Sequence, residues 1–117
     1  MKLKNIVENL KLNVIAGDSL LDREVSGGYV SDMLSDVIAH SSKGDLWVTL
    51  QTHLNIIAVA SMKELSAILI VNNRRPDEET LKKAVDEKIP VLNTEMNAFQ
   101  VVGKLYQLGI RGQDEDV

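Results

Sequence analysis

The chain has 117 residues, a formal net charge of −4 at pH 7 and a hydrophobic content of 44%. These values predict one globular domain and argue against a nucleic-acid partner bound through its phosphates. The absence of cysteine excludes disulfides, thiolate metal sites and cysteine nucleophiles. No segment has the apolar run of a signal peptide or of a membrane span, so we expect a cytoplasmic protein with no membrane partner.

The N-terminal third of the chain predicts two helices, one strand and a long loop. Apolar residues at helical spacing predict a helix over residues 3–10, and residues 12–16 are typical of a short strand. Residues 17–28 are expected to form a loop that ends in two glycines just before the second helix. Either Ser31 or Asp32 is expected to cap that helix. Its shared apolar face is formed by Leu34, Val37 and Ile38.

In the rest of the chain, strands and helices alternate. Apolar and β-branched runs predict strands at residues 46–50, 67–71 and 91–92. Residues 54–65 also contain side chains that favour strands. A helix is nevertheless expected there, because a parallel neighbour requires a crossover of about a dozen residues. Residues 77–88 form the clearest helix, since acidic residues lie at its start and lysines toward its end.

The last helix is expected to be capped by Thr94 or Asn97 and to stop at Gly109. This order of elements predicts a single α/β domain over residues 1–112, three-layer-like, with a mainly parallel sheet flanked by helices. Residues 113–117 are expected to be an acidic, frayed tail. The apolar residues on one side of the last helix are Phe99, Val102 and Tyr106.

In parallel sheets, ligands bind beyond the carboxyl ends of the strands. The loops after the three predicted strands converge on that edge, and we expect any small ligand to bind there. The first loop could bind a polar ligand, or its threonine could merely cap a helix. The arginines of the second loop could recognise a carboxylate or phosphate, or could be solvated. The ligand-binding candidates are Gln51, Thr52, His53, Asn72, Arg74 and Thr94.

A second group of candidates surrounds two adjacent glycines, which allow close backbone approach. Gly27-Gly28 could cradle a phosphate or form a tight turn in a packed or dimeric interface. The Walker pattern Gly-x-x-x-x-Gly-Lys-Ser/Thr is absent, so kinase activity is not expected. Asp22 and Arg23 are expected to pair with other groups and pin the loop. The two histidines lie in separate predicted elements, so no metal site is expected, and no cofactor either.

The stretch from residue 22 to residue 32 resembles the signature of the DRTGG domain, with serine in place of threonine. The residues that carry this motif are Asp22, Arg23, Ser26, Gly27 and Gly28. Further similar segments are residues 28–37, 49–53 and 76–80, and residues 98–99 together with 103–106. The resemblance implies an α/β module related to the N-terminal region of HPr serine kinase/phosphorylase. Similar modules are fused to CBS domains in some pyrophosphatases and to phosphotransacetylases, which implies regulation or assembly.

The expected function is a non-catalytic regulatory or ligand-binding module that acts as a homodimer. Its ligand would be a nucleotide or a phosphorylated metabolite. Tyr29, Trp47 and several apolar helices in a small chain favour a dimer, as does the context of the related modules. One alternative is a small enzyme acting on a phosphorylated or nucleotide substrate, with His53 as acid–base. A further alternative is a scaffold that docks onto a larger partner.

Overall fold

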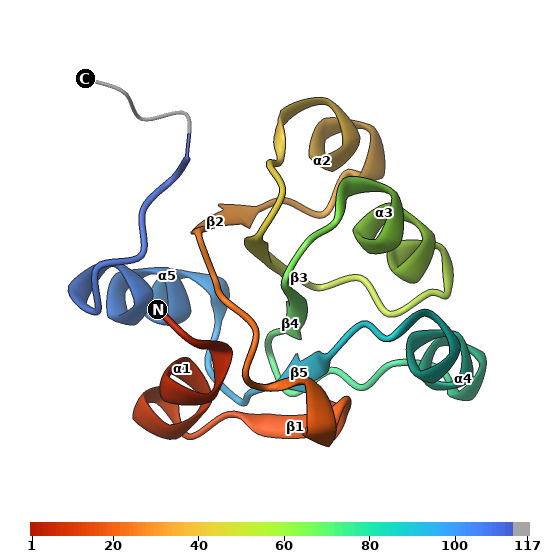
Figure 1. The fold of residues 1–117 in the computed structure, drawn as a ribbon, viewed down its shortest axis with the longest axis horizontal. Coiled ribbons are helices and arrows are strands. Elements are labelled where there is room, and N and C mark those ends of the chain that lie inside the picture. The colour runs from red at the N-terminus through yellow and green to blue at the C-terminus, as the bar shows by residue number, and fades with distance from the viewer. Residues whose placement is uncertain (114–117) are drawn as a thin grey trace.

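Five strands within residues 1–113, the part of the chain that the computed structural model describes, form one sheet in the order β1-β5-β4-β3-β2 (Figure 1). Strands β2 to β5 are parallel, and β1 pairs with β5 in the antiparallel direction. The predicted, mainly parallel α/β sheet is therefore confirmed. The strands are β1 (Asn13–Ala16), β2 (Gly27–Val30), β3 (Asp45–Thr49), β4 (Ala67–Ile70) and β5 (Val91–Asn93).

Helices cover both faces of this sheet. One hydrophobic cluster joins α1 and α5 to one face, and a second joins α2, α3 and α4 to the other. Because β3 and β4 are buried on both faces, their sequences are continuously apolar. The helices are α1 (Leu3–Leu10), α2 (Leu34–His40), α3 (Asn55–Lys63), α4 (Glu78–Glu87) and α5 (Ala98–Gln107), with a short 3₁₀ helix η1 (Asp18–Leu20) after β1.

The ambiguous segment at residues 54–65 is a helix, α3, as the need for a crossover predicted. The predicted loop over residues 17–28 is wrong at its end, because Gly27–Val30 form β2 beside β3. Glycines are rare in strands, but pairing and burial outweigh that preference here. Tyr29 lies opposite Trp47 in this pairing. The parallel part of the sheet is thus one strand wider than predicted.

The residue before α2 differs from the predicted caps, whereas α5 is capped by one of its two predicted residues. The residue before α2 is Met33, and the Asp32 carboxylate instead accepts hydrogen bonds from the Leu50 N–H at 2.7 Å and the Thr49 hydroxyl at 2.9 Å. At α5, Asn97 is the cap, in a reciprocal pair with Gln100. The three apolar residues expected on one side of α5 do share a face, but that face is exposed. We call Phe99, Val102 and Tyr106 the α5 strip; their exposed fractions are 90%, 41% and 52%.

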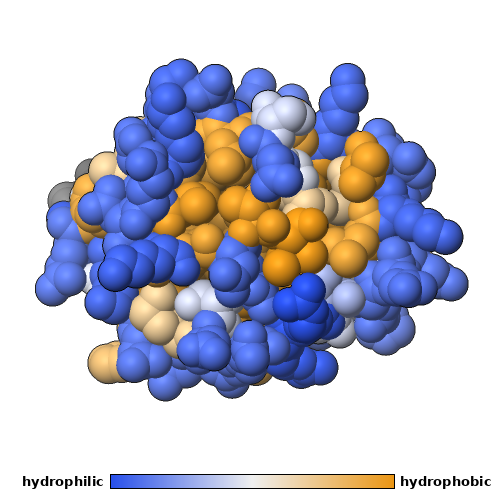
Figure 2. All heavy atoms as spheres, turned by 90° about the horizontal axis from the view of Figure 1, so that it is seen from below, coloured by the Kyte–Doolittle hydropathy of each residue, from blue (hydrophilic) through white to orange (hydrophobic). Residues whose placement is uncertain are grey.

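A second apolar surface lies on the lower face of the molecule. Seen from below, hydrophobic residues cover a broad area bordered by hydrophilic ones (Figure 2). The elements at the bottom of Figure 1 are α1, β1 and α4. Val14 and Ile15 of the edge strand β1 are only half-buried, and Val85 of α4 is exposed. None of the helices within residues 1–113 is long and apolar enough to cross a membrane. The tail was predicted over residues 113–117, and its residues 114–117, which include all of its acidic residues, lie outside the described part of the chain.

One carboxylate near the β2 edge makes folding stability depend on pH. The Tyr29 hydroxyl donates a hydrogen bond of 2.8 Å to Asp36, and the His40 imidazole lies 3.1 Å from the same carboxylate. The Tyr29 bond is the largest cause that lowers the pKa of Asp36, followed by a bond from Ser31. A lowered pKa in the folded state stabilises the fold above the ordinary aspartate pKa. That stability is lost as the pH falls through the lowered pKa.

We therefore expect Tyr29→Phe to destabilise the protein more at neutral pH than in acid. Urea denaturation at about pH 6 and about pH 2.5, on either side of the ordinary aspartate range, measures the difference. Asp36→Asn should remove this part of the pH dependence. A Tyr29→Phe effect of the same size at both pH values would show that the bond does not depend on the Asp36 charge.

Candidate functional site

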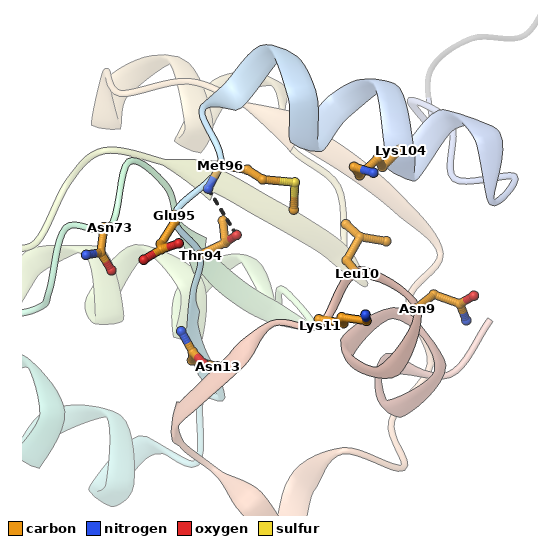
Figure 3. A pocket seen from close by; sticks show the side chains of 9 residues that line it. All are labelled: Asn9, Leu10, Lys11, Asn13, Asn73, Thr94, Glu95, Met96 and Lys104. Carbon is orange, nitrogen blue, oxygen red and sulfur yellow. Dashed lines mark hydrogen bonds between the residues drawn. The ribbon is translucent and has the colours of Figure 1, made fainter.

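A polar cavity of about 590 Å³ opens where β1 meets β5, at the carboxyl edge of the parallel strands (Figure 3). Its walls come from the C-terminal end of α1, the start of β1, the loops after β4 and β5, and the last turns of α5. The volume falls within the roughly 300–1,000 Å³ typical of small-ligand sites. The lining includes the amides of Asn9, Asn13 and Asn73.

The antiparallel pairing of β1 with β5 places this cavity. Asn13 lies opposite Asn93, and the Asn13 side chain donates a hydrogen bond of 2.9 Å to the Asn93 side chain. The buried Asn93 in turn donates to the main-chain carbonyl of Arg74 at 3.2 Å. Buried amides must be hydrogen-bonded, so these two bonds hold β1, β5 and the loop after β4 in one arrangement. These hydrogen bonds of the buried Asn93 therefore fix the position of this edge of the cavity.

The loop after β4 contains two adjacent residues in the left-handed region, Asn72 with φ 59° and Asn73 with φ 55°. Asparagine tolerates this conformation better than most residues, although it still costs energy. The N–H groups of both residues donate to the loop after β5, at 2.9 Å to Met96 and 2.7 Å to Thr94. Strained backbone held by its surroundings clusters at ligand sites. The loop is thus fixed against the neighbouring loop that lines the cavity.

The charges of the lining are unequally placed. Lys11, the left-handed residue that ends α1, and Lys104, near the end of α5, lie on the helix side. Glu95 and Asn73 lie on the side of the loops after β5 and β4 (Figure 3). Within residues 1–113, none of the three charged side chains forms an ion pair. Two cations face one anion, so the cavity has an excess positive charge in an acidic protein.

Of the candidates predicted at this edge, only Thr94 lines the cavity. The Thr94 hydroxyl accepts a hydrogen bond of 3.2 Å from the Met96 N–H, which leaves its proton free to donate (Figure 3). Asn72 and Arg74 are exposed on the adjacent loop, outside the lining. The cavity therefore lies at the predicted carboxyl edge, toward its β1 end.

The other three candidates lie at the end of β3, away from the cavity. The Gln51 side chain donates a hydrogen bond of 2.8 Å to the Asp32 carbonyl. Thr52 is buried, and its carbonyl accepts a bond of 2.7 Å from the Thr80 hydroxyl. His53 is exposed, and no described residue forms a hydrogen bond or ion pair with its side chain. Within residues 1–113, no three His, Asp or Glu side chains gather as a metal site would require.

Sequence reasoning missed Lys11 and Lys104, along with the amides of Asn9 and Asn13. Both lysines are exposed helix residues of the kind that are usually solvated. They share a cavity only because β1 pairs with β5 and brings the end of α1 beside α5. They could have been found only if the sequence had indicated that β1 pairs with β5.

The motif residues lie at the opposite, amino edge of the parallel strands. Arg23 donates hydrogen bonds to the Ser66 carbonyl at 3.2 Å and the Lys88 carbonyl at 3.1 Å, so it ties its loop to β4 and α4. Burial lowers the pKa of Arg23. Asp22 forms an exposed ion pair with Lys4 at 3.4 Å, a contact worth little in water. Arg23 thus pins the loop, as expected, through carbonyl groups and not through acids.

The two motif glycines lie at the place where residues 110–113 cross β2. We call residues 110–113 the C-terminal strap. The Arg111 carbonyl accepts a hydrogen bond of 3.1 Å from the Gly28 N–H, and the Gln113 side chain donates to the buried Asp45 carboxylate at 2.7 Å. A Cβ on Gly27 would lie 2.7 Å from the Arg111 carbonyl oxygen and 2.5 Å from Gln113 Cγ. The close approach of the strap therefore requires glycine at this position.

The remaining motif residue, Ser26, lies beside the turn that leads into β3. Its N–H donates a hydrogen bond of 2.9 Å to the Gly44 carbonyl. Gly44 has φ +85°, and a Cβ there would lie 2.6 Å from the Ser26 hydroxyl oxygen. All of the motif residues therefore lie at the amino edge of the parallel strands, and none of them lines the polar cavity.

Comparison with known proteins supports the fold and the family. No curated protein matches the chain. Ten chains of solved structures match it. One contains the CBS and DRTGG domains of the regulatory region of Clostridium perfringens pyrophosphatase, complexed with its activator, diadenosine tetraphosphate. The match has a TM-score of 0.69 and 17% identity over 99% of this chain, which spans about half, 52%, of that chain. The DRTGG domain matches residues 5–108, and the chain therefore belongs to the DRTGG domain family.

Proposed function

We propose that the chain is a non-catalytic regulatory module that binds a small anionic ligand, a nucleotide or a phosphorylated metabolite, in the polar cavity. The observation that carries the proposal is the pair of lysines, Lys11 and Lys104, which face a cavity of ligand size without a carboxylate partner among residues 1–113. Ammonium groups are hydrogen-bond donors only, and they bind phosphate and carboxylate groups.

The setting of the pyrophosphatase relative supports a regulatory role. That protein binds its activator through a region that contains CBS domains as well as DRTGG domains. The similarity therefore supports a regulatory role. The ligand site proposed for this chain rests on its own residues. We further propose a cytoplasmic location and a relation to the N-terminal region of HPr serine kinase/phosphorylase in fold and regulation, without phosphate transfer.

Lys104→Gln is expected to weaken the binding of nucleoside monophosphates and sugar phosphates by about tenfold or more, because a charge-assisted hydrogen bond is lost. Isothermal titration calorimetry with both classes of probe measures the change. Lys83→Gln is the matched control, since Lys83 is an exposed lysine of α4 on the other face of the sheet and its loss changes the net charge equally.

Arg74→Ala tests whether the ligand binds in the cavity or at the site predicted on the loop after β4. Weaker binding in Arg74→Ala together with unchanged binding in Lys104→Gln would move the ligand to that loop. Catalytic turnover that is abolished by His53→Gln would replace the regulatory function with the enzymatic alternative. His53 is exposed and has no hydrogen-bond or ion-pair partner for its side chain among residues 1–113, which gives that alternative no support because a general base is normally oriented by a neighbour.

We propose that the module acts as a homodimer through the α5 strip. Phe99 is 90% exposed, and a groove of about 220 Å³ beside the strip is lined mainly by apolar groups of β2, α5 and the C-terminal strap. Exposed apolar patches of this kind mark interaction sites, and two-fold pairs are the commonest assemblies. Trp47 does not contribute, because it is fully buried within the single chain.

Tyr106→Lys is expected to convert the dimer to a species of about 12.9 kDa, because it places a charge within the apolar contact. Sedimentation velocity at micromolar concentration distinguishes the two states. Val85→Lys is the control, since Val85 is an exposed apolar residue of α4, away from the strip. Dissociation by Val85→Lys alone would place the interface on the exposed side of α4. A wild-type protein that sediments only as a monomer would contradict the dimer itself.

A further inference from the structure

The polar cavity has two chemically different ends. Its helix side carries the ammonium groups of Lys11 and Lys104, which can only donate hydrogen bonds. Its loop side carries the carboxylate of Glu95, which can only accept them when it is ionised. Figure 3 shows Glu95 beside Asn73, with the lysines toward the opposite side of the view. A ligand that satisfies both ends needs an anionic group at one and an N–H donor at the other.

A simple polyanion would satisfy only half of this arrangement. A phosphate group held by the lysines gains charge-assisted hydrogen bonds, but a second anionic group at the loop side would meet Glu95. The negative charges of that group and of Glu95 would repel each other. Glu95 has no cationic partner within residues 1–113, so its charge is available to select the ligand. The unequal placement of charge therefore argues against a bisphosphate that spans the cavity.

The wall between the two ends is suited to a flat ring. Leu10 and Met96 contribute apolar surface there, and the thioether of methionine adapts to ring faces and contacts them favourably. The Thr94 hydroxyl lies in the same part of the wall with its proton free to donate. An aromatic base between these side chains would be held by apolar contact and by one directional hydrogen bond.

We infer that the cavity takes a nucleoside monophosphate whose base carries an exocyclic amino group. The phosphate binds Lys11 and Lys104, the base packs on Leu10 and Met96, and the amino group donates to Glu95. This inference rests on the proposed function, because it specifies the ligand of the same cavity. The amino group is the selective element, since a carbonyl at that position would place two hydrogen-bond acceptors against each other.

Adenosine 5′-monophosphate and inosine 5′-monophosphate test the inference, because their bases present an amino group and a carbonyl at the same ring position. We expect calorimetry to show about tenfold tighter binding of the adenosine compound to the wild type. In Glu95→Gln the preference should fall to within about twofold, since an amide can donate to the carbonyl of inosine. Glu79→Gln, an exposed carboxylate of α4, is the matched control and should keep the wild-type preference.

The possible outcomes separate this inference from the proposed function. If both nucleotides bind the wild type equally and both are weakened by Lys104→Gln, the anion site stands and the selectivity for an amino group is overturned. If a preference for the adenosine compound persists unchanged in Glu95→Gln, Glu95 is not the selecting residue and the inference fails. If neither nucleotide nor any sugar phosphate binds the wild type, the proposed function fails together with the inference.

Discussion

Trp47→Ala is expected to destabilise the protein by about 3–5 kcal/mol, the range for truncating a large buried aromatic side chain. Trp47 is fully buried in the middle of β3, where it packs with α2 and α3. Its indole N–H also donates a hydrogen bond of 2.8 Å to the Ser31 carbonyl. Because a domain of this size has a total stability of about 5–15 kcal/mol, this substitution removes a large part of it.

Urea denaturation followed by circular dichroism measures the loss in Trp47→Ala. Trp47→Phe separates the two contributions, because it keeps much of the apolar volume while it removes the hydrogen-bond donor. We expect a loss of about 1–3 kcal/mol for that variant, mainly from the unsatisfied carbonyl and a small cavity. Equal losses in the two variants would mean that ring packing contributes little and that the bond to Ser31 dominates.

Gly27→Ala and Gly28→Ala are expected to differ although the two glycines are adjacent. A Cβ at Gly27 would overlap the C-terminal strap, where the nearest main-chain atom lies at 2.7 Å, so overpacking should cost about 1–3 kcal/mol. A Cβ at Gly28 would meet Ile110 at 3.4 Å, close to ordinary contact. Alanine there restricts the unfolded chain, so Gly28→Ala should be neutral or stabilise by less than about 1 kcal/mol.

Thermal and urea unfolding of the two variants check this contrast. The variant Gln113→Ala removes one of the two contacts that a Cβ at Gly27 would make with the strap, so part of the Gly27→Ala loss should be recovered in the double variant. Losses that are equal at both glycines would show that their role is conformational and is unrelated to the strap. The contrast therefore assigns a physical role to the residue pair after which the family is named.

The fold was largely predictable because most of its signals are local. Continuous apolar runs at β3 and β4, and acidic and basic ends at α4, identify these elements without knowledge of their neighbours. The segment of α3 was ambiguous by composition, and the crossover rule decided it correctly. Strand β2 was missed since its two glycines have low strand propensity, and only its pairing with β3 stabilises it.

The candidate site was less predictable because it depends on contacts between distant segments. The parallel strands predicted a site at the carboxyl edge, where the polar cavity lies, and Thr94 is in its lining. Lys11 and Lys104 give no sequence signal, since each is an exposed lysine near a helix end. The exposure of the α5 strip also could not be predicted from the sequence. Periodicity shows that Phe99, Val102 and Tyr106 share a face, but it does not show what covers that face.

The family motif and the polar cavity occupy opposite edges of one sheet, and this separation has a consequence for genetics. Mutations at the amino edge, such as those of Arg23 or Gly27, should lower the amount of folded protein while each surviving molecule still responds to its ligand. Mutations of Lys104 should leave the amount unchanged and weaken the response to the proposed ligand, and mutations of Glu95 should change which nucleotides cause that response. Overexpression should therefore rescue alleles of the first class and fail to rescue alleles of the second.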